Sequence, residues 1–421
     1  MELLVEQLIR HLGVFAVLVV VAMLAWNLWL TYINMLYLQS IDWIMLEIIP
    51  PKEVHKSPEA MELVLNVLHG GDMDNWYEKY WKGELGQFYS LEIVSTEGKI
   101  HFYIRFAKKF KKAFEAQLYA QYPQAEVREV EDYTKSFPEY VKDGPINVFA
   151  YDMKLKKDDP YPIKTYVDFG LDRAIGSLEE QQRIDPITPT LEVMGSIGIG
   201  EHIWIQINTR KAIKRHEVKK GDEVEKEKSW QDKSREIINE LKAKANSKDA
   251  DGKTIAGRLS KGEQNVIEAI ERHRNKPGFD TGIRVLYVAK KDNFNGNTIT
   301  AFTSMFRQYA TEDMNSFSLD NITKTVEPWK DITLAEGGSV LEKKKKDFLE
   351  DYKKRSFFYK GFRFDKISRY FTNPEKGGKK GFILSSEELA TIYHLPGKVA
   401  ETPNFIRIES KKGEPPANLP I

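Results

Sequence analysis

The chain has 421 residues, with 63 Lys and Arg against 62 Asp and Glu, so its net charge is +1. This balance argues against a globally basic nucleic-acid-binding protein, although it does not exclude local basic patches. Cysteine is absent, which excludes disulfides, zinc thiolates and cysteine catalysis. Hydrophobic residues make up 41% of the chain, enough for folded cores, and its length predicts two or three domains besides any membrane segment.

Between Arg10 and Asp42 the sequence contains no Asp, Glu, Lys or Arg, and the centre of this stretch runs from Leu12 to Leu30. About 20 apolar helical residues are enough to cross a bilayer core. Aromatic residues in its second half are typical of a helix that leaves the hydrocarbon for the headgroups. We therefore predict a membrane anchor over residues 1–47. Its lipid-contacting residues are expected to include Phe15, Val19, Leu24, Trp26 and Trp29.

Two other interpretations of this stretch, a buried core helix and a cleaved signal peptide, fit less well. A core helix of this length without a charge on any face is rare. A signal peptide has a shorter apolar region and a small-residue cleavage site, whereas residues 43–46 are bulky. Pro50 and Pro51 are expected to stop the helix. Flanking charges do not settle the orientation, because Arg10 alone precedes the apolar run and lysines follow only after Pro51.

Residues 48–135 are predicted to form a first α+β module. Ser57 and Pro58 provide an N-cap and a first-turn proline, and apolar residues then recur at helical spacing. Alternation of apolar and polar residues predicts the strands. The order is helix, strand, strand, helix, strand, over about 58–69, 89–94, 99–106, 107–122 and 126–131.

A connector over residues 136–184 is expected to carry strands around Ile146–Met153 and Thr165–Phe169, with a polar turn between them. Acidic residues in or beside this turn are expected to be solvated. They are Asp152, Asp158 and Asp159.

Residues 185–322 repeat the pattern of the first module. A short helix around 187–194 precedes a strand at 203–207, and a second strand, a helix and a last strand follow around 283–287, 299–309 and 317–319. The hairpin turn is replaced by a charged insert over 211–278, read as a helical hairpin with arms near Trp230–Ala245 and Lys261–Arg274 and a mobile loop at Asn246–Lys253. The predicted fold class is α+β, with a transmembrane helix and two ferredoxin-like αββαβ modules. The alternative is coincidence between two unrelated α+β stretches.

The tail over residues 323–421 is less regular. A lysine-rich helix is expected over Val340–Arg355, with Phe348, Leu349 and Tyr352 on its contact side. A short strand at 382–384 is followed by Ser385 with Glu388 three residues later, a capping box that opens a helix.

No motif in the chain marks an enzyme. Gly252-Lys253-Thr254 resembles the end of a phosphate loop, but Ser247 occupies the position where such a loop needs glycine. The eight histidines are scattered, and His202 and His394 are interpreted as structural or surface residues. We therefore expect no catalytic, cofactor-binding or metal-binding residues, no cofactor and no small-molecule substrate.

Three lysine clusters could meet phosphates of DNA or an acidic partner. Lysines on a helix face are more often only a solvated surface, and nearby aromatic residues are more often core than base-stacking platforms. The clusters comprise Lys108, Lys109, Lys111 and Lys112; Lys343, Lys344, Lys345 and Lys346; and Lys379 and Lys380.

Several short segments of the sequence resemble a known group of proteins. The segment that follows the anchor and short segments in both modules resemble bacterial proteins that are associated with type IV secretion. Such proteins are common in candidate-phylum bacteria. These segments are 49–53, 56–62, 89–95, 120–126 and 200–206. Residues 382–391 with Tyr393–Pro396 resemble the junction just before the motor core of conjugative coupling ATPases.

This resemblance implies the membrane-anchored, non-motor region of such an ATPase, because only about 25 residues follow Pro396 where the motor core would begin. It also implies a body on the cytoplasmic side of the inner membrane. The expected function is a non-catalytic, single-pass subunit of a type IV secretion or conjugation-like machine. Its expected partners are the lipid bilayer, a separate motor ATPase and other secretion subunits, and homo-oligomerisation stays open. The alternatives are a membrane-tethered DNA-binding protein that uses the lysine clusters, and an unrecognised hydrolase.

Overall fold

The structure is a computed structural model that describes residues 2–51, 56–70, 75–172, 184–212, 215–217, 226–245, 247–248, 254–255, 259–323, 340–358, 379 and 381–397. The chain divides into two compact units. Unit 1 combines residues 1–42, 71–87 and 356–380, and unit 2 combines residues 43–70, 88–355 and 381–421.

Unit 1 contains the long helix α1 (Glu2–Ser40) and the short helix α3 (Trp76–Tyr80). One helix in the described part of the chain, α1, is long and apolar enough to cross a membrane, and its most apolar stretch is not buried inside the protein. The predicted N-terminal apolar helix is therefore confirmed. By length and composition alone, a signal sequence would meet the same criterion.

The helix ends at Ser40, whereas the sequence predicted an anchor that continues to residue 47. Residues Trp43–Ile49 instead form strand β1, whose backbone pairs with strands on both sides. Ile44, Leu46 and Ile48 point into the main core. The run is apolar because β1 has a paired strand on each side and is buried on both faces, so Pro50 ends a strand and not a helix.

Unit 2 is built on an antiparallel sheet, which confirms a mixed fold of helices and strands. Its other strands are β2 (Phe88–Thr96), β3 (Lys99–Ala107), β4 (Glu126–Val130), β5 (Ile146–Leu155), β6 (Glu201–Lys211), β11 (Gly278–Lys290), β12 (Phe317–Asp320) and β13 (Phe382–Ser385). Their order is β12-β5-β11-β6-β2-β3-β1-β4, and β13 pairs with the start of β11. Minor strands pair as β7 (Arg215–Glu217) with β8 (Lys226–Lys228) and β9 (Ser247–Lys248) with β10 (Thr254–Ile255).

The two halves of the sheet repeat one arrangement. In the chain, β1, α2 (Pro58–Asn66), β2, β3, α4 (Lys111–Gln121) and β4 correspond to β5, α5 (Thr188–Gly195), β6, β11, α8 (Gly296–Ser304) and β12. In each half the strands lie in the order fourth, first, third, second, and the halves join where β2 pairs with β6. Each half therefore begins with a strand that the sequence analysis assigned elsewhere. Most of β1 was assigned to the anchor, and β5 was assigned to the connector.

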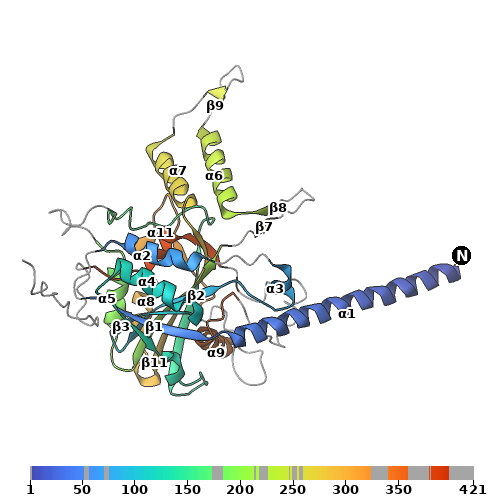
Figure 1. Ribbon diagram of the computed structural model, residues 1–421, viewed down its shortest axis with the longest axis horizontal. Coiled ribbons are helices and arrows are strands. Elements are labelled where there is room, and N and C mark those ends of the chain that lie inside the picture. Colours follow the sequence, from blue (N-terminus) through green and yellow to red (C-terminus); the bar gives the residue numbers. More distant parts are fainter. Residues whose placement is uncertain are drawn as a thin grey trace, which may run out of the picture. The chain divides into compact units, whose positions relative to one another are not determined.

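The two faces of the sheet carry different helices (Figure 1). On β6, Ile203, Ile205 and Ile207 face a core shared with α2, α4, α5, α8 and α11 (Ser386–Ile392), while Trp204 faces α9 (Val340–Lys353). The predicted lysine-rich helix is thus present, and its predicted contact residues Phe348, Leu349 and Tyr352 are buried. Short 3-10 turns complete the fold at Val67–His69, Lys108–Phe110, Tyr133–Ser136, Lys291–Asn293 and Arg307–Tyr309.

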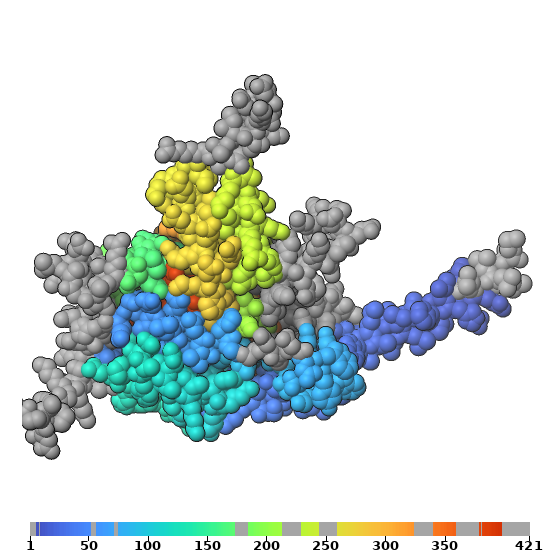
Figure 2. Space-filling view, turned by 45° about the horizontal axis from the view of Figure 1, so that its top comes forward, coloured from blue at the N-terminus to red at the C-terminus, as the bar shows by residue number. Residues whose placement is uncertain are grey.

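The charged insert forms the helical pair α6 (Trp230–Ala245) and α7 (Lys261–Arg274), with the same bounds as the predicted arms. The helices lie side by side around a small apolar core that includes Ile238, Ile267 and Ile270 (Figure 2). Of the loop predicted to be mobile, only Ser247–Lys248 lies within the described residues.

Two expectations for the connector are wrong. Residues Thr165–Phe169 form a turn, because the Asp168 carboxylate accepts a hydrogen bond from the Thr165 backbone N–H at 2.9 Å and closes the chain on itself. Asp152 is not solvated but only 3% exposed, because β5 continues past it and the Arg284 guanidinium lies 3.3 Å from its carboxylate.

Candidate functional site

The segment formed by β13 and α11 is held deep inside unit 2. Strand β13 pairs with residues 278–281 of β11, and the Ser386 backbone N–H donates to the Pro277 carbonyl at 2.9 Å. Ser385 and Glu388 form the predicted capping box at the start of α11. Every residue of α11 is buried, including the carboxylates of Glu387 and Glu388. Two buried carboxylates in one helical turn require partners on other elements.

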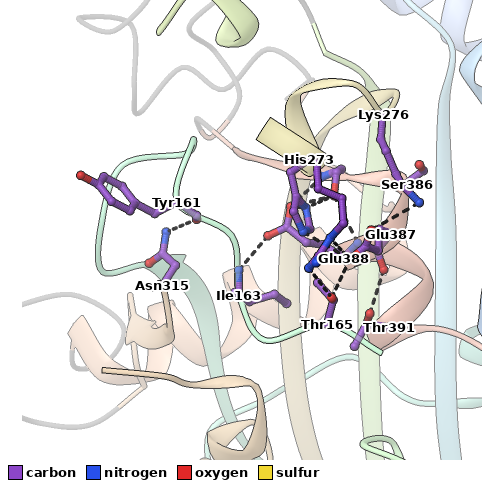
Figure 3. A network of polar contacts seen from close by, with 12 residues as sticks. Tyr161, Ile163, Thr165, His273, Lys276, Asn315, Ser386, Glu387, Glu388 and Thr391 are labelled. Carbon is purple, nitrogen blue, oxygen red and sulfur yellow. Dashed lines mark hydrogen bonds and ion pairs between the residues drawn. The ribbon is translucent and has the colours of Figure 1, made fainter. Parts of the chain in front are cut away.

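Glu387 collects its partners from the turn after β5 and from the end of α7 (Figure 3). The Thr165 hydroxyl donates to its carboxylate at 2.6 Å. The Arg272 Nε and His273 Nε2 atoms lie 3.2 and 3.3 Å from the same carboxylate oxygen, and the Lys276 Nζ lies 3.3 Å from the other. One carboxylate therefore meets three basic side chains.

Glu388 faces the other side of the same imidazole. Its carboxylate accepts from the Ser385 backbone at 2.8 Å and from the Ile163 backbone N–H at 2.9 Å. The His273 Nδ1 atom lies 3.5 Å from Glu388 and 2.7 Å from the Ser385 hydroxyl. His273 thus lies between two carboxylates of α11.

Glu62 of α2 completes the network. It accepts from the Lys276 ammonium at 2.9 Å, from the Ser386 hydroxyl at 2.8 Å and from the Tyr166 hydroxyl at 2.8 Å. We name the whole set the clasp. It comprises Glu62, Thr165, Arg272, His273, Lys276, Ser385, Ser386, Glu387 and Glu388.

The three basic side chains of the clasp face its three carboxylates and also Asp168, which lies 3.2 Å from Arg272, so the surroundings of His273 favour its protonated form. Burial lowers the pKa of His273, but its contacts with Glu387 and Glu388 outweigh burial and raise the pKa to about 9. Burial raises the pKa of Glu387, but His273, Thr165 and Arg272 outweigh it and lower the pKa to about 2. Near neutral pH the histidine therefore carries its proton and the carboxylate is ionised.

The geometry of the clasp suits a structural role, in which it holds segments of unit 2 together, better than a role in proton transfer. A general base must be able to take up a proton near the working pH, and a protonated histidine between carboxylates cannot. The contacts instead join α2, the turn at residues 163–168, the base of α7 and the β13–α11 segment, which are distant in sequence. Removing one member would take a partner away from several buried groups at once, which makes such a network cooperative.

The sequence was compared with known families and proteins. Residues 30–407 match the model of a family described as a domain of unknown function, DUF8128. The chain belongs to this family. No curated protein matches the chain. The DUF8128 match begins in the second half of α1 and includes every residue of the clasp, so the clasp lies within the region that defines the family.

A second polar pair holds the end of this segment. The His394 Nε2 atom lies 2.9 Å from the Asp185 carboxylate, which also accepts from the Ile187 backbone N–H at 3.1 Å. Both partners are buried, and burial alone would lower the pKa of His394, but Asp185 outweighs burial and raises it. The structural role predicted for His394 fits this pairing.

The first lysine cluster lies at the start of α4, in unit 2. Lys108, Lys109 and Lys112 are exposed, while Lys111 pairs with Glu129 at 2.6 Å. The Lys109 Nζ atom lies 5.1 Å from the ring centre of Phe110.

The second cluster lies on α9 and is largely engaged. Lys344 donates to the Ile322 carbonyl at 2.7 Å, Lys345 donates to Asn147 at 3.0 Å, and Lys346 pairs with Glu350 at 3.9 Å. Because α4 and α9 cover opposite faces of the sheet, the structure does not bring the first two clusters together.

The last pair of lysines is only partly described. Lys380 lies outside the described residues, whereas the Nζ atom of Lys379 lies 5.9 Å from the ring centre of Phe357. Lys379 and Phe357 both belong to unit 1.

The predicted anchor residues all lie on α1. Phe15, Trp26 and Trp29 are exposed, and Val19 and Leu24 are half-buried. This exposure is consistent with lipid contact, because the apolar stretch of α1 is not covered by protein.

Sequence reasoning missed most of the clasp. It identified the capping box but not Glu62, His273 or Lys276, because those partners come from distant segments. The available signal was the adjacent pair Glu387 and Glu388 beside a buried strand, since two carboxylates there require basic partners.

We expect the clasp to make the stability of unit 2 depend on pH. The folded pKa of His273 lies above its ordinary value of 6.5, so its contribution is complete below pH 6.5 and is lost as the pH rises through about 9. The folded pKa of Glu387 lies below its ordinary value of 4.5, so its contribution is complete above pH 4.5 and is lost as the pH falls through about 2. Urea unfolding of the full chain in detergent should therefore show a loss of up to about 3 kcal/mol from His273 between pH 6.5 and 9.

His273→Gln should flatten this alkaline loss, leaving only the part that comes from His394. His202→Gln is the matched control, because burial lowers the pKa of His202 and places its titration below this pH range. An alkaline loss that is the same in His273→Gln as in the unmodified chain would contradict a charged His273.

Proposed function

We propose that the chain is a non-catalytic, single-pass subunit of a type IV secretion or conjugation-like machine in the inner membrane. Helix α1 anchors it, unit 2 lies on the cytoplasmic side, and a separate motor ATPase and other secretion subunits are its partners. Bound DNA and a small-molecule substrate are not part of this proposal.

The observation that carries the proposal is the position of the β13–α11 segment. Residues 382–396 resemble the junction that precedes the motor core in conjugative coupling ATPases. In this chain α11 is entirely buried, and the clasp ties it to α2 and to the base of α7. A junction held in this way would give a motor a fixed place relative to unit 2, as a coupling subunit requires.

The sheet supports an adaptor role with two modules. A ferredoxin-like module contains four strands in the spatial order fourth, first, third, second, with its two helices on one face. Both halves of the sheet have this order, and α2, α4, α5 and α8 share one core. We regard the halves as two ferredoxin-like modules that are fused edge to edge, with α6 and α7 inserted in the second.

The arrangement of lysines favours a protein partner over DNA. Lysines that contact phosphates need to line one continuous surface. The clusters on α4 and α9 lie on opposite faces of the sheet, and Lys344 and Lys345 already donate to groups within the protein.

Affinity purification of the full-length chain from native membranes, followed by mass spectrometry, tests the proposal. We expect enrichment of a P-loop ATPase and further secretion subunits relative to a matched control that carries only residues 1–42. Glu387→Ala should reduce recovery of the ATPase, whereas Glu192→Ala, an exposed position on α5, should not. Recovery of DNA alone, released by salt, would replace the proposal with a membrane-tethered DNA-binding protein.

A further inference from the structure

Unit 1 gathers exposed aromatic side chains from two segments that are distant in sequence. Trp26 of α1 stacks on Tyr80 of α3 with ring centres 6.1 Å apart, and Trp29 meets Trp81 at 5.9 Å. The Trp29 indole N–H also donates to the Tyr80 carbonyl at 3.2 Å. Figure 2 shows the segment that contains α3, in light blue, beside α1. The aromatic group keeps its outer members uncovered, with Trp76 at 62% exposure, Tyr77 at 55% and Trp81 at 48%.

A glycine fixes this contact. Gly83 has a φ of +67°, a conformation that favours glycine, and a Cβ atom there would lie 2.5 Å from the Ile33 carbonyl carbon. The backbone after α3 therefore runs directly against the backbone of α1. Asn75 caps α3 by accepting from the Tyr77 backbone N–H at 3.1 Å. Both ends of the segment are thus held, and its aromatic side chains have a defined position along α1.

That position corresponds to a membrane surface. At about 1.5 Å per residue, α1 rises about 28 Å from Arg10 to Trp29, close to a hydrocarbon core of about 30 Å. If Arg10 marks one face of the membrane, Trp29 and the α3 aromatics that touch it lie at the other. Trp and Tyr concentrate at this depth because their rings are apolar and their N–H and O–H groups are polar.

We infer that residues 75–83, with α3 at their centre, lie in the headgroup region of the membrane that α1 crosses and set the depth of α1. This inference rests on the proposed membrane insertion of α1. The recognised partner is the bilayer interface itself. Glu78, Lys79, Lys82 and Glu84 balance in charge, so the contact is aromatic and does not require anionic lipid.

Single nitroxide labels on the full chain in phosphatidylcholine vesicles test the inference, because the chain has no native cysteine. Labels are placed through Tyr77→Cys on α3, Val17→Cys in the middle of α1 and Glu192→Cys in unit 2. Accessibility to oxygen and to a water-soluble nickel chelate reports the depth of each label. We expect the Tyr77 label to lie between the Val17 label, in hydrocarbon, and the Glu192 label, in water. Adding anionic lipid should not shift it.

Gly83→Val provides a second measurement, because the added side chain would collide with α1. It should move the Tyr77 label toward water and leave the Val17 label in hydrocarbon. A Tyr77 label as accessible as the Glu192 label, with Val17 still in hydrocarbon, would overturn the interfacial position of α3 alone. A Tyr77 label protected in native membranes but not in vesicles would assign the aromatic group to a protein partner and equally overturn it. A Val17 label in water would overturn the membrane anchor itself.

Discussion

Glu387→Ala should lower the free energy of unfolding of the region around α11 by about 3–5 kcal/mol, because the substitution breaks a buried ion network from one side. Arg272, His273 and Lys276 would then face one another without the carboxylate that lies within 3.2–3.3 Å of each. The Thr165 hydroxyl would also lose its acceptor. The loss should appear first where β13 pairs with β11, since the clasp holds the segment that includes both β13 and α11.

Hydrogen exchange of the backbone amides of residues 382–384 measures this loss directly. A cost of 3–5 kcal/mol corresponds to a fall in protection of about 10²- to 10⁴-fold. Glu192→Ala is the matched control, because its side chain is exposed on α5 and such surface changes usually stay within about 0.5 kcal/mol. Equal protection in Glu387→Ala and in the control would show that apolar packing of α11, and not the clasp, holds the segment.

Most helices and strands could be predicted because their periodicity is local. On β3, Ile100, Phe102 and Ile104 alternate with less buried residues, and on α7 the buried residues recur at helical spacing. Strand β1 escaped prediction for the opposite reason. It has a paired strand on each side and is buried on both faces, so its apolar run resembles a continuation of α1.

The spatial order of the strands was harder to predict than their existence. The strand at Ile146–Leu155 was recognised, but nothing local indicates that it pairs with β11 and β12 and so begins the second half of the sheet. The turn at Thr165–Phe169 was mistaken for a strand, because the hydrogen bond from Thr165 to Asp168 outweighs the apolar alternation.

The candidate site shows the same division between local and distant information. The capping box at Ser385 was readable because both of its residues lie within one helical turn. Glu62 and Ser386 are 324 residues apart, and their hydrogen bond has no local pattern. Asp152 was predicted to be solvated because a polar turn follows it. Its environment is instead set by Arg284 on the neighbouring strand.

Arg355→Met should destabilise unit 2 by about 3–5 kcal/mol, because it removes the charged partner of a fully buried carboxylate. Glu92 has no exposed surface, and the Arg355 Nε atom lies 2.9 Å from it. Arg355 also donates to the carboxylate of Asp132, a residue of the segment between β4 and β5. Burial raises the pKa of Glu92, and Arg355 is the main group that lowers it, with help from Ser90 and Tyr133. Without Arg355 the carboxylate must either stay charged in a buried site or take up a proton, and both outcomes cost stability.

The effect should be specific to charge, because methionine preserves much of the side-chain volume. The double variant Glu92→Gln with Arg355→Met should recover part of the loss, since a neutral amide can still be hydrogen-bonded by Ser90 and Tyr133, which lie 2.6 and 2.7 Å from Glu92. Urea unfolding of the four chains in one detergent gives the coupling energy between the two residues. A coupling near zero would mean that the pair of Glu92 and Arg355 adds nothing to the packing of Phe348, Leu349 and Tyr352.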